Sequence, residues 1–591
     1  MGSCCGGDRS ALAGALVDRL PAGTVAGAVD PERPKRPASP TAPHRDAARP
    51  DDRRPSADRA DLLVLGPVAT GVPGAAPAEA MAVRDGRVLA TGTMADLADL
   101  RAPDTEVLDA GDGAVIPGLI EPHMHLWSTG VFYGWLDCSA EANPTFDAVV
   151  DRIRAAVATA APGSWVCGQL FDPSRYPGEP TLDAAILDQI STEVPIVVTN
   201  ASMHFAYVSS TVFDRVGITA DTPDPPSGRF YRRDGKLTGV VGELNGMMAI
   251  LGHLPQKSAD ELAASLRAIM SEAASRGVTS MREALTGELQ GAGEIALLQQ
   301  MNAAQQLPTR LSLAQSGMHG AAFWSDAGIV PGGGDAMIRT DAWKLMIDGS
   351  TQGRSAYLRT DYLGGMGGNG AANFEVDELV ALVRAGHDAG WQVMIHANGD
   401  AGIDRALTAY EAVLAGASAI ERRHRLEHIA VGRDEHFVRM QRAGISPSFL
   451  NAHIYYWGAA LRDSILGPDR AALLQRLGTA QRMGLRASLH SDYNVSPIHP
   501  LLAARIAVQR RTQADDEVLG PDDRVAPHDA LRAITLDAAW QIFGDDRGTL
   551  EPGKLADFAV VSANPWTADP DGWADITVSQ TRLGGAVAWE G

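Results

Sequence analysis

The sequence predicts an α/β fold, a (β/α)8 barrel of the TIM type that carries a small β-sandwich domain built from both ends of the chain. Two observations indicate this. In the middle of the chain, amphipathic helical segments end at a glycine and lead directly into short apolar strands. Toward both ends, short apolar runs are separated by Asp-Gly or Gly turns, which are typical of β-hairpins. A chain of 591 residues is long enough for a barrel with a second domain.

The β-rich ends form the first element of this prediction. From Asp61 the sequence runs DLLVLG, then AMAVRDGRVLATG and EVLDAGDGAVIPG, and GTLEPGKLADFAVV and ITVSQTRLGGAVAWEG near the C-terminus have the same pattern. We therefore expect residues 61–116 and 548–591 to form one composite β-sandwich. Residues 1–60 differ, because they hold ten Lys or Arg, eight Asp or Glu and recurrent prolines. That composition cannot build a core, so it predicts a disordered Pro-, Ala- and Arg-rich extension.

The barrel is expected over residues 117–547, with a long insertion after its first strand. A glycine after each helix is the usual left-handed helix stop. Helix, glycine and strand in series predict parallel strands with crossover helices, which leaves a barrel or an open doubly wound sheet. No Gly-x-Gly-x-x-Gly motif follows a predicted strand, which favours the barrel. The four units are Arg276-Gly277-Val278, Ala389-Gly390-Trp391, Ala443-Gly444-Ile445 and Met483-Gly484-Leu485.

Composition excludes several classes of function. The formal net charge of −21 argues against a broad nucleic-acid surface, since phosphate binding needs clustered Lys and Arg. No apolar run approaches the roughly 18 to 20 residues that a membrane span requires. Four cysteines without a Cys-x-x-Cys pair give no disulfide framework and favour a reducing, cytoplasmic setting. We expect a small-molecule substrate and no nucleic-acid or membrane partner, while a homo-oligomer remains open.

A His-x-His pair lies where an apolar run ends, in the segment VIPGLIEPHMHLW from Val115 to Trp127. Alternate residues of a strand point the same way, so His123 and His125 would project into one site, as metal ligands do. With fifteen histidines in the chain, one such pair is close to chance expectation. The pair therefore indicates a metal site only if other strands supply ligands at their C-terminal ends, where barrels place their chemistry.

A lysine in a strand-like apolar run is the next candidate. Lys344 lies in AWKLMIDGS, and an unpaired buried ammonium is costly, so such a lysine is usually paired or neutral. One interpretation is a structural pair with Asp348 or another acid. The other is a lysine whose lowered pKa lets it take up carbon dioxide as a carbamate, an anion that can bridge two cations.

Three later strands also end in candidate ligands. His396 closes the apolar run in QVMIHANGD, His428 closes that in HRLEHIAVG, and Asp492 follows the strand in LRASLHSDYNVSP. A single buried histidine is by default structural, and a carboxylate there can bind metal, move a proton or cap a helix. We expect His428 to be a ligand and His424, four residues earlier, to be structural.

Taken in order, His-x-His, Lys, His, His and Asp on successive strands resemble the metal set of the binuclear amidohydrolases. The resemblance covers about residues 60–591 and points to the YtcJ-like branch of that superfamily, amidohydrolase family 3, which includes N-substituted formamide deformylases. The matching motifs are VKxxxDG with Lys344, Asp348 and Gly349, HaxGD with His396, Gly399 and Asp400, RxEH with Arg425, Glu427 and His428, and GxLEPGKLADFAVV near the C-terminus.

Departures from the branch concern the substrate more than the ligands. The branch often has Gly-Ser-Asp where this chain has His490-Ser491-Asp492, which keeps the acid. GQLFDPSRYP replaces the branch's Gly- and Trp-rich motif around Asp172, and the segment before Arg276 is long. The resemblance therefore leaves the substrate open.

The resemblance implies two divalent cations, with Zn²⁺ the first expectation and Mn²⁺ or Fe²⁺ as alternatives. Both ions would share a bridging carbamate, N6-carboxylysine at Lys344. A metal-bound hydroxide would attack a carbonyl carbon, and Asp492 would accept the proton and pass it to the leaving nitrogen. His204, in a motif like the branch's Asp-Gly-His, could donate to the oxyanion. The implied ligands are His123, His125 and Asp492 for one ion and His396 and His428 for the other.

These expectations indicate hydrolysis of a C–N bond in an amide, formamide or cyclic amide. A metal-dependent lyase, decarboxylase or isomerase is an alternative, because a fold does not fix a reaction. A non-catalytic scaffold of the dihydropyrimidinase-like kind is a third, but such proteins lose ligands and this chain keeps all six. The candidates for substrate binding are Trp127, Asp172, Arg354, Asn398, His453 and Tyr493.

Overall fold

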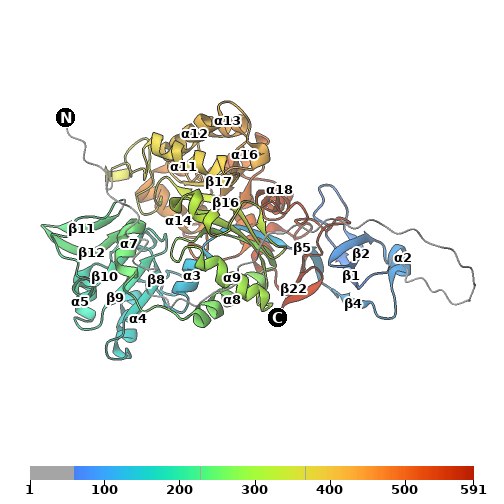
Figure 1. The fold of residues 1–591 in the computed structure, drawn as a ribbon, viewed down its shortest axis with the longest axis horizontal. Coiled ribbons are helices and arrows are strands. Elements are labelled where there is room, and N and C mark those ends of the chain that lie inside the picture. The colour runs from blue at the N-terminus through green and yellow to red at the C-terminus, as the bar shows by residue number, and fades with distance from the viewer. Residues whose placement is uncertain (1–58, 227, 366–367) are drawn as a thin grey trace, which may run out of the picture. The chain divides into compact units, whose positions relative to one another are not determined.

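The computed structural model describes residues 59–226, 228–365 and 368–591, which fold into three sheets with their helices (Figure 1). The extension predicted for residues 1–60 lies outside this part, except for its last two residues. Among the described residues, no helix is both long and apolar enough to cross a membrane. The predicted (β/α)8 barrel and the β-sandwich domain with strands from both ends of the chain are confirmed.

Eight parallel strands of the described chain form the barrel. They are β6 (Leu119–Met124), β13 (Val278–Thr286), β14 (Arg310–Ser316), β16 (Ile338–Met346), β17 (Gln392–Ala397), β18 (Arg425–His428), β19 (Ser446–Phe449) and β20 (Ser488–Leu489). Each pairs in parallel with the next in this order. Beyond β20, the N–H of Asp492 donates to the carbonyl of His123 at 3.2 Å, and the N–H of His125 donates to that of Tyr493 at 2.8 Å. These bonds connect the last strand to the first at the level of the predicted ligands.

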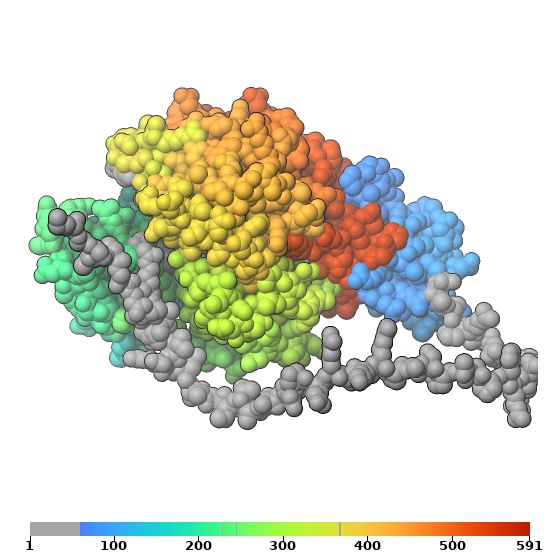
Figure 2. Space-filling model, turned by 45° about the horizontal axis from the view of Figure 1, so that its top comes forward, coloured from blue at the N-terminus to red at the C-terminus, as the bar shows by residue number. Residues whose placement is uncertain are grey.

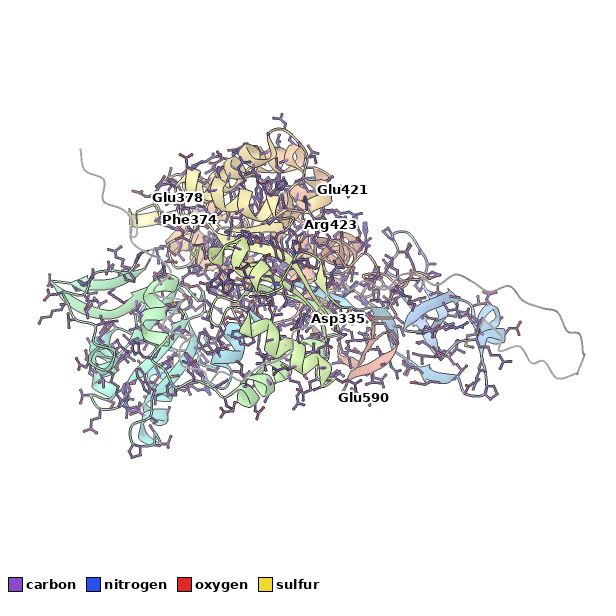
Figure 3. All side chains as sticks on the ribbon, in the orientation of Figure 1. Asp335, Phe374, Glu378, Glu421, Arg423 and Glu590 are labelled. Atoms are coloured by element: carbon purple, nitrogen blue, oxygen red, sulfur yellow. The ribbon has the colours of Figure 1, made fainter. Side chains whose placement is uncertain are left out.

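The helices between these strands end as the sequence predicts. The glycine after each of the four predicted stops has a positive φ, between 69° and 96°, a conformation that is strained for residues with a side chain. Arg423, which is labelled in Figure 3, lies just before β18. Its guanidinium is 4.9 Å from the ring of Trp540 and donates to the Trp540 carbonyl at 2.7 Å. This contact ties α19 (Leu536–Gln541) to the barrel. The helices before β13, β17, β19 and β20 are α8 (Ala259–Ser275), α11 (Val376–Asp388), α13 (Asp434–Ala443) and α16 (Leu477–Arg482).

One sheet combines the two ends of the described chain, and the blue and red segments lie side by side in Figure 2. Its strands are β1 (Leu62–Val68), β2 (Ala78–Arg84), β3 (Arg87–Gly92), β4 (Glu106–Asp109), β5 (Ala114–Pro117), β21 (Phe558–Val561), β22 (Val578–Leu583) and β23 (Ala586–Glu590). β21 is antiparallel to β5, with Phe558 opposite Pro117. A buried ion pair between Arg310 and Asp557, with two hydrogen bonds of 2.7 and 2.9 Å, fixes this sheet to the barrel. β5 then leads through Gly118 into β6 and the two predicted ligands at its end.

The long segment after β6 is a structured layer of its own. Its six strands are β7 (Leu136–Asp137), β8 (Val166–Phe171), β9 (Ile196–Asn200), β10 (Phe205–Val208), β11 (Arg229–Arg233) and β12 (Lys236–Gly242), followed by α7 (Glu243–Leu251). β7, β8 and β9 are parallel, and β10, β12 and β11 continue the sheet antiparallel. The ends of its strands deliver Asp172, His204 and Glu243 toward the barrel residues described next.

Candidate metal centre

All six predicted ligands lie at the C-terminal ends of barrel strands and form one cluster. Five of them are less than one-tenth exposed, and His125 is partly exposed. Alternate residues of β6 point to the same side, and the parallel barrel strands align their C-terminal ends. The segment after β20 returns to β6 through backbone hydrogen bonds, so the six side chains meet. The six are His123 and His125 at the end of β6, Lys344 in β16, His396 in β17, His428 as the last residue of β18, and Asp492 beyond β20.

The first group consists of the His-x-His pair and Asp492. Asp492 Oδ1 lies 3.3 Å from His123 Nε2 and 3.2 Å from His125 Nε2. This oxygen is buried and has no hydrogen-bond partner among the described residues. A buried carboxylate oxygen left without a hydrogen bond is costly. Two imidazole nitrogens around such an oxygen form a donor set that suits a zinc-like cation.

The second group contains His396 and His428, whose ring centroids are 4.5 Å apart. Asp492 joins the two groups, because its Oδ2 lies 3.9 Å from His428 Nδ1. His428 and Asp492 both have left-handed backbone, with φ of 71° and 53°. Such conformations cost on the order of 1 kcal/mol or more and cluster at functional sites. The backbone therefore bends at both predicted ligands and turns their side chains into the cluster.

Lys344 lies between the two groups and has no partner in Asp348. Its Nζ is 3.3 Å from His123 Nε2, and its side chain is almost fully buried. Within the described residues Lys344 forms no ion pair with Asp348, whose carboxylate instead accepts three backbone N–H groups at 2.8 to 2.9 Å. Burial lowers the pKa of Lys344 to about 8, against the opposing effect of nearby Glu427. A neutral amine, which carbamate formation requires, is therefore accessible near neutral pH.

Glu427 orients the first histidine, a role that the sequence motif alone did not assign. Its Oε2 lies 2.6 Å from His123 Nδ1 and accepts from Arg425 at 2.7 Å. Burial disfavours the charged form, but Arg425 and His123 hold the pKa of Glu427 far below its usual range. An ionised carboxylate at Nδ1 fixes the proton there and leaves the Nε2 lone pair for a metal.

His204 lies beside the second group and is held by Glu243. Its Nδ1 is 2.8 Å from Glu243 Oε2, and its ring centroid is 5.6 Å from that of His396. The backbone N–H of Glu243 also donates to the His204 carbonyl at 2.7 Å. Burial alone would lower the pKa of His204, but Glu243 raises it. Glu243 begins α7 with a φ of 60°. Nothing in the sequence around Glu243 predicted that it would contact His204.

Two of the predicted substrate residues are already engaged. Arg354 forms a two-point ion pair with Glu179, with N–O distances of 2.8 and 2.9 Å. Asp172 is buried, and its Oδ2 accepts from Trp457 Nε1 at 2.8 Å. Both contacts join the inserted layer to loops of the barrel, so in this state they position the loops and leave neither charge free for a ligand.

The other four candidates differ in what they can offer. Asn398 Oδ1 and Trp127 Nε1 are both buried and have no hydrogen-bond partner in the part of the chain that the structure describes. His453 Nδ1 accepts from Gln475 at 3.0 Å, which places the proton of the neutral ring on Nε2. Burial keeps the pKa of His453 low, at about 4. By contrast, the Tyr493 hydroxyl donates to Glu272 of α8 at 3.0 Å.

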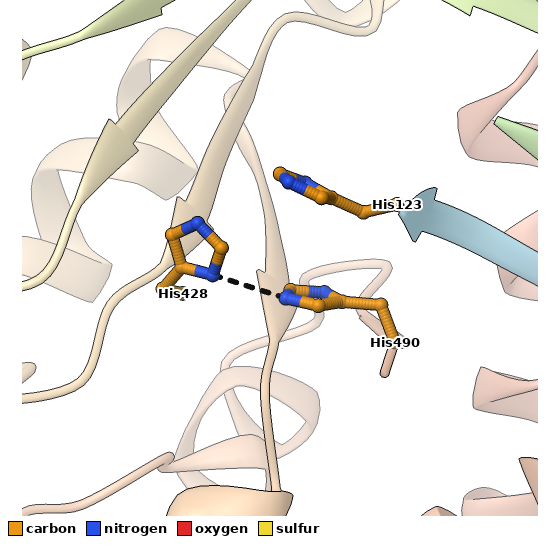
Figure 4. A group of neighbouring side chains, drawn as sticks. All are labelled: His123, His428 and His490. Atoms are coloured by element: carbon orange, nitrogen blue, oxygen red, sulfur yellow. Dashed lines mark hydrogen bonds between the residues drawn. The ribbon is translucent and has the colours of Figure 1, made fainter. Parts of the chain in front are cut away.

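His490 also lies in the cluster, although we did not predict it as a site residue. It is 1% exposed, its ring stacks on that of His123 at 4.7 Å, and its Nε2 is 3.1 Å from His428 Nδ1 (Figure 4). The nitrogens of these three rings also lie close enough together to hold a metal. The replacement of the branch's usual glycine by this histidine was the signal that could have identified it.

The sequence matches a model of the amidohydrolase family over residues 106–588. It is 28% identical over 527 residues to N-substituted formamide deformylase from Arthrobacter pascens, covering 87% of this chain and 95% of the relative. It is 29% identical over 531 residues to Protein LONG AFTER FAR-RED 3 from Arabidopsis thaliana, covering 86% and 88%. Putative amidohydrolase YtcJ from Bacillus subtilis is 24% identical over 527 residues, with 87% and 96% covered.

Solved structures with the same fold include two metal-dependent hydrolases described as uncharacterized. The one from Pyrococcus horikoshii has a TM-score of 0.68 at 18% identity, covering 86% of this chain and 99% of that one. The one from Pyrococcus furiosus has a TM-score of 0.65 at 21% identity, covering 85% and 99%. At these identities the likeness extends to the fold alone.

Proposed function

Because the chain belongs to the amidohydrolase family, and is thus a hydrolase with a histidine-rich candidate metal site, we propose that it hydrolyses a C–N bond of a formamide, an amide or a cyclic amide. The position of Asp492 carries this proposal: Oδ1 faces the His-x-His pair and Oδ2 faces His428. One carboxylate thus adjoins both groups of imidazoles. The relative from Arthrobacter pascens, a formamide deformylase, supports the choice of bond.

The proposed centre holds two divalent cations, Zn²⁺ by preference and Mn²⁺ or Fe²⁺ as alternatives. His123, His125 and Asp492 would hold one and His396 and His428 the other, with carboxylated Lys344 between them. When bound, such cations acidify a water molecule toward neutral pKa and polarise a carbonyl oxygen.

The protein's own residues would then bind, orient and move protons. Asp492 accepts a proton from the attacking water and delivers it to the leaving nitrogen, since its carboxylate lies in the centre of the cluster. His204 donates from Nε2 to the developing oxyanion in its doubly protonated form, which Glu243 favours because it accepts from Nδ1 and raises the pKa of the ring. His453 Nε2 and Asn398 are the proposed donors and acceptors for the rest of the substrate.

The proposed substrate is a small molecule, and the setting is the cytoplasm. The free thiols of Cys138, which is buried, and Cys167 fit a reducing compartment. Because Arg354 is paired with Glu179, neither side chain offers a free charge to a ligand. We therefore propose a substrate whose part next to these two residues is neutral.

A screen of N-formyl and N-acyl amines with metal-loaded protein tests the proposal. We expect amine release with one oxygen-18 from labelled water in the new carboxylate. The matched variant Asp492→Asn keeps the volume of the side chain and should lose this release. Product without the label would instead establish a lyase, decarboxylase or isomerase and refute hydrolysis.

A further inference from the structure

We infer that His490 is a positioning residue of the metal centre, which holds His428 in the tautomer whose Nε2 lone pair is free for a cation. The inference depends on the proposed function only in requiring a metal at His428. It follows from a chain of hydrogen bonds whose direction can be worked out from one end to the other. The chain runs from the base of the barrel through Gln541, Ser488 and Ser448 to His490.

The direction of the chain is set at Gln541, the last residue of α19. Its Nε2 lies 2.7 Å from the carbonyl of Pro447, which can only accept. The side-chain nitrogen and oxygen of Gln541 are thereby distinguished, and Oε1 must face the hydroxyl of Ser488 at 2.5 Å. Because an amide oxygen only accepts, the Ser488 hydroxyl donates its one proton to Gln541 Oε1. All three residues are buried in the barrel.

The next links transmit this direction to His490. Ser448 Oγ lies 2.8 Å from Ser488 Oγ, whose proton is already used, so Ser448 must donate to Ser488. Because Ser448 donates its one hydroxyl proton to Ser488, its Oγ can only accept from His490 Nδ1, which lies 2.7 Å away. His490 therefore carries its proton on Nδ1, and in the neutral ring Nε2 holds a lone pair.

The last link reaches the predicted ligand. His490 Nε2 is 3.1 Å from His428 Nδ1, so its lone pair accepts a proton that resides on His428 Nδ1 (Figure 4). The lone pair of His428 is consequently on Nε2. Asp492 Oδ2 cannot take the place of His490, because at 3.9 Å it is too far from Nδ1 for a hydrogen bond. His490 thus does at Nδ1 of His428 what Glu427 does at Nδ1 of His123.

A direct ligand role for His490 is the competing assignment, since its nitrogen lies close enough to those of His123 and His428. The two roles exclude each other, because His490 has one Nε2 lone pair. If a cation took that lone pair, His428 would either keep an Nδ1–H without an acceptor or bind the same cation through Nδ1 and carry its proton on Nε2, which has no hydrogen-bond acceptor among the described residues. The geometry therefore favours positioning.

Two substitutions separate the roles. His490→Gln offers an amide oxygen near the place of Nε2 and can still accept from His428, whereas His490→Leu cannot. Amide oxygens are poor ligands for zinc beside imidazoles. We expect competition with a chelator to show zinc affinity falling about 10- to 100-fold in His490→Leu, with His490→Gln restoring most of it. Equal losses in both variants, in folded protein with unchanged thermal unfolding, would assign His490 as a ligand and overturn the inference.

A measurement on the unaltered chain covers the case in which a variant does not fold. Nitrogen-15 NMR of metal-free and zinc-loaded protein reports the tautomer of each imidazole. The inference requires His490 to carry its proton on Nδ1 in both states and requires zinc to shift Nε2 of His428. A zinc shift at Nδ1 of His428 would refute it. If wild-type protein bound no zinc at all, the proposed function would fail instead, and the two failures are therefore distinguishable.

Discussion

Two hydrogen-bonded pairs of histidines lie at the two ends of one strand, β18, and all four rings except the partly exposed His387 are buried. Before its first residue, His424 Nδ1 accepts the backbone N–H of Val393 at 2.9 Å, and its Nε2 lies 2.8 Å from His387 Nδ1. At its last residue, His428 Nδ1 pairs with His490 at 3.1 Å. At the N-terminal end of β18, both ring nitrogens of His424 have partners in the protein. At the C-terminal end of β18, His490 occupies Nδ1 of His428, and Nε2 of His428 is left for a ligand.

The difference indicates that burial and a neighbouring imidazole do not by themselves make a candidate metal site. His424 and His428 are four positions apart in the sequence, and both are almost fully buried. What differs is the end of the barrel: the C-terminal end gathers a carboxylate, a lysine and more imidazoles around His428, while His424 packs against Tyr410. The expectation that His424 is structural is thus explained by its two hydrogen bonds.

Substitution of Lys344 should give the largest effect, because this side chain lies between the two groups of ligands. In Lys344→Ala we expect loss of the paired metals and at least about a 1000-fold fall in turnover, because the bridging anion and both Lewis acids act together. The barrel should still fold. Elemental analysis together with steady-state kinetics measures both quantities, and acetate or propionate should restore part of the activity.

The salt-bridge interpretation of Lys344 makes the opposite prediction. Removal of a charge from a buried pair would destabilise the fold by roughly 3 to 5 kcal/mol, with the metal content retained. Apo protein reconstituted with zinc should also regain activity faster when bicarbonate is present. A reconstitution rate that does not depend on bicarbonate would argue against the carbamate.

The same substitution at both ends of β18 tests the comparison directly. His428→Leu should remove most bound metal while leaving the free energy of unfolding within about 1 kcal/mol of wild type. His424→Leu should keep the metal but lose roughly 1 to 3 kcal/mol of stability, because it leaves the N–H of Val393 without an acceptor. Chemical denaturation and metal analysis of the two variants, side by side, measure these effects. Metal loss in His424→Leu without unfolding would contradict the distinction.

Glu427→Gln should have an intermediate effect. The variant keeps the shape of the side chain but removes the anion that holds His123 by its Nδ1. We expect zinc affinity to fall about 10- to 100-fold, the usual range for a partner of this kind. Chelator competition measures the loss. Glu435→Gln, an exposed acid on α13, is the matched control and should leave zinc affinity unchanged.

The smallest effect concerns the pH dependence of stability. Burial, with a further contribution from His387, lowers the pKa of His424 from 6.5 to about 3. Below about pH 6.5, His424 binds a proton in the unfolded chain but not in the folded protein. The free energy of unfolding therefore decreases as the pH falls from about 6.5 toward 3. The loss approaches roughly 1.4 kcal/mol per pH unit for this residue. The unfolding free energy of His424→Leu should therefore fall less steeply between pH 6 and pH 4 than that of wild type.

Much of this molecule is predictable from local sequence patterns. Glycine helix stops and apolar runs indicated the barrel, because Gly277 and its counterparts must adopt a positive φ wherever a crossover helix meets a strand. The order of the ligands indicated that they meet at one rim, since parallel strands align their C-terminal ends. These inferences work because strand direction and helix termination are local properties.

The residues that support the predicted ligands could not be predicted in the same way. Glu243 meets His204 across 39 positions of sequence, and His490 depends on Ser448 and Gln541, which lie 42 and 51 positions away. Neither contact leaves a periodic trace in the sequence. Likewise, Arg354 was a candidate for substrate until the fold brought Glu179 to it. Partners of this kind are set by tertiary packing.

The metal content of the purified protein tests the central claim most directly. We predict close to two divalent ions per chain by elemental analysis, complete loss of hydrolytic activity on treatment with a strong chelator, and recovery with Zn²⁺ or Mn²⁺. Folded protein that is free of metal and still turns over substrate would contradict the account.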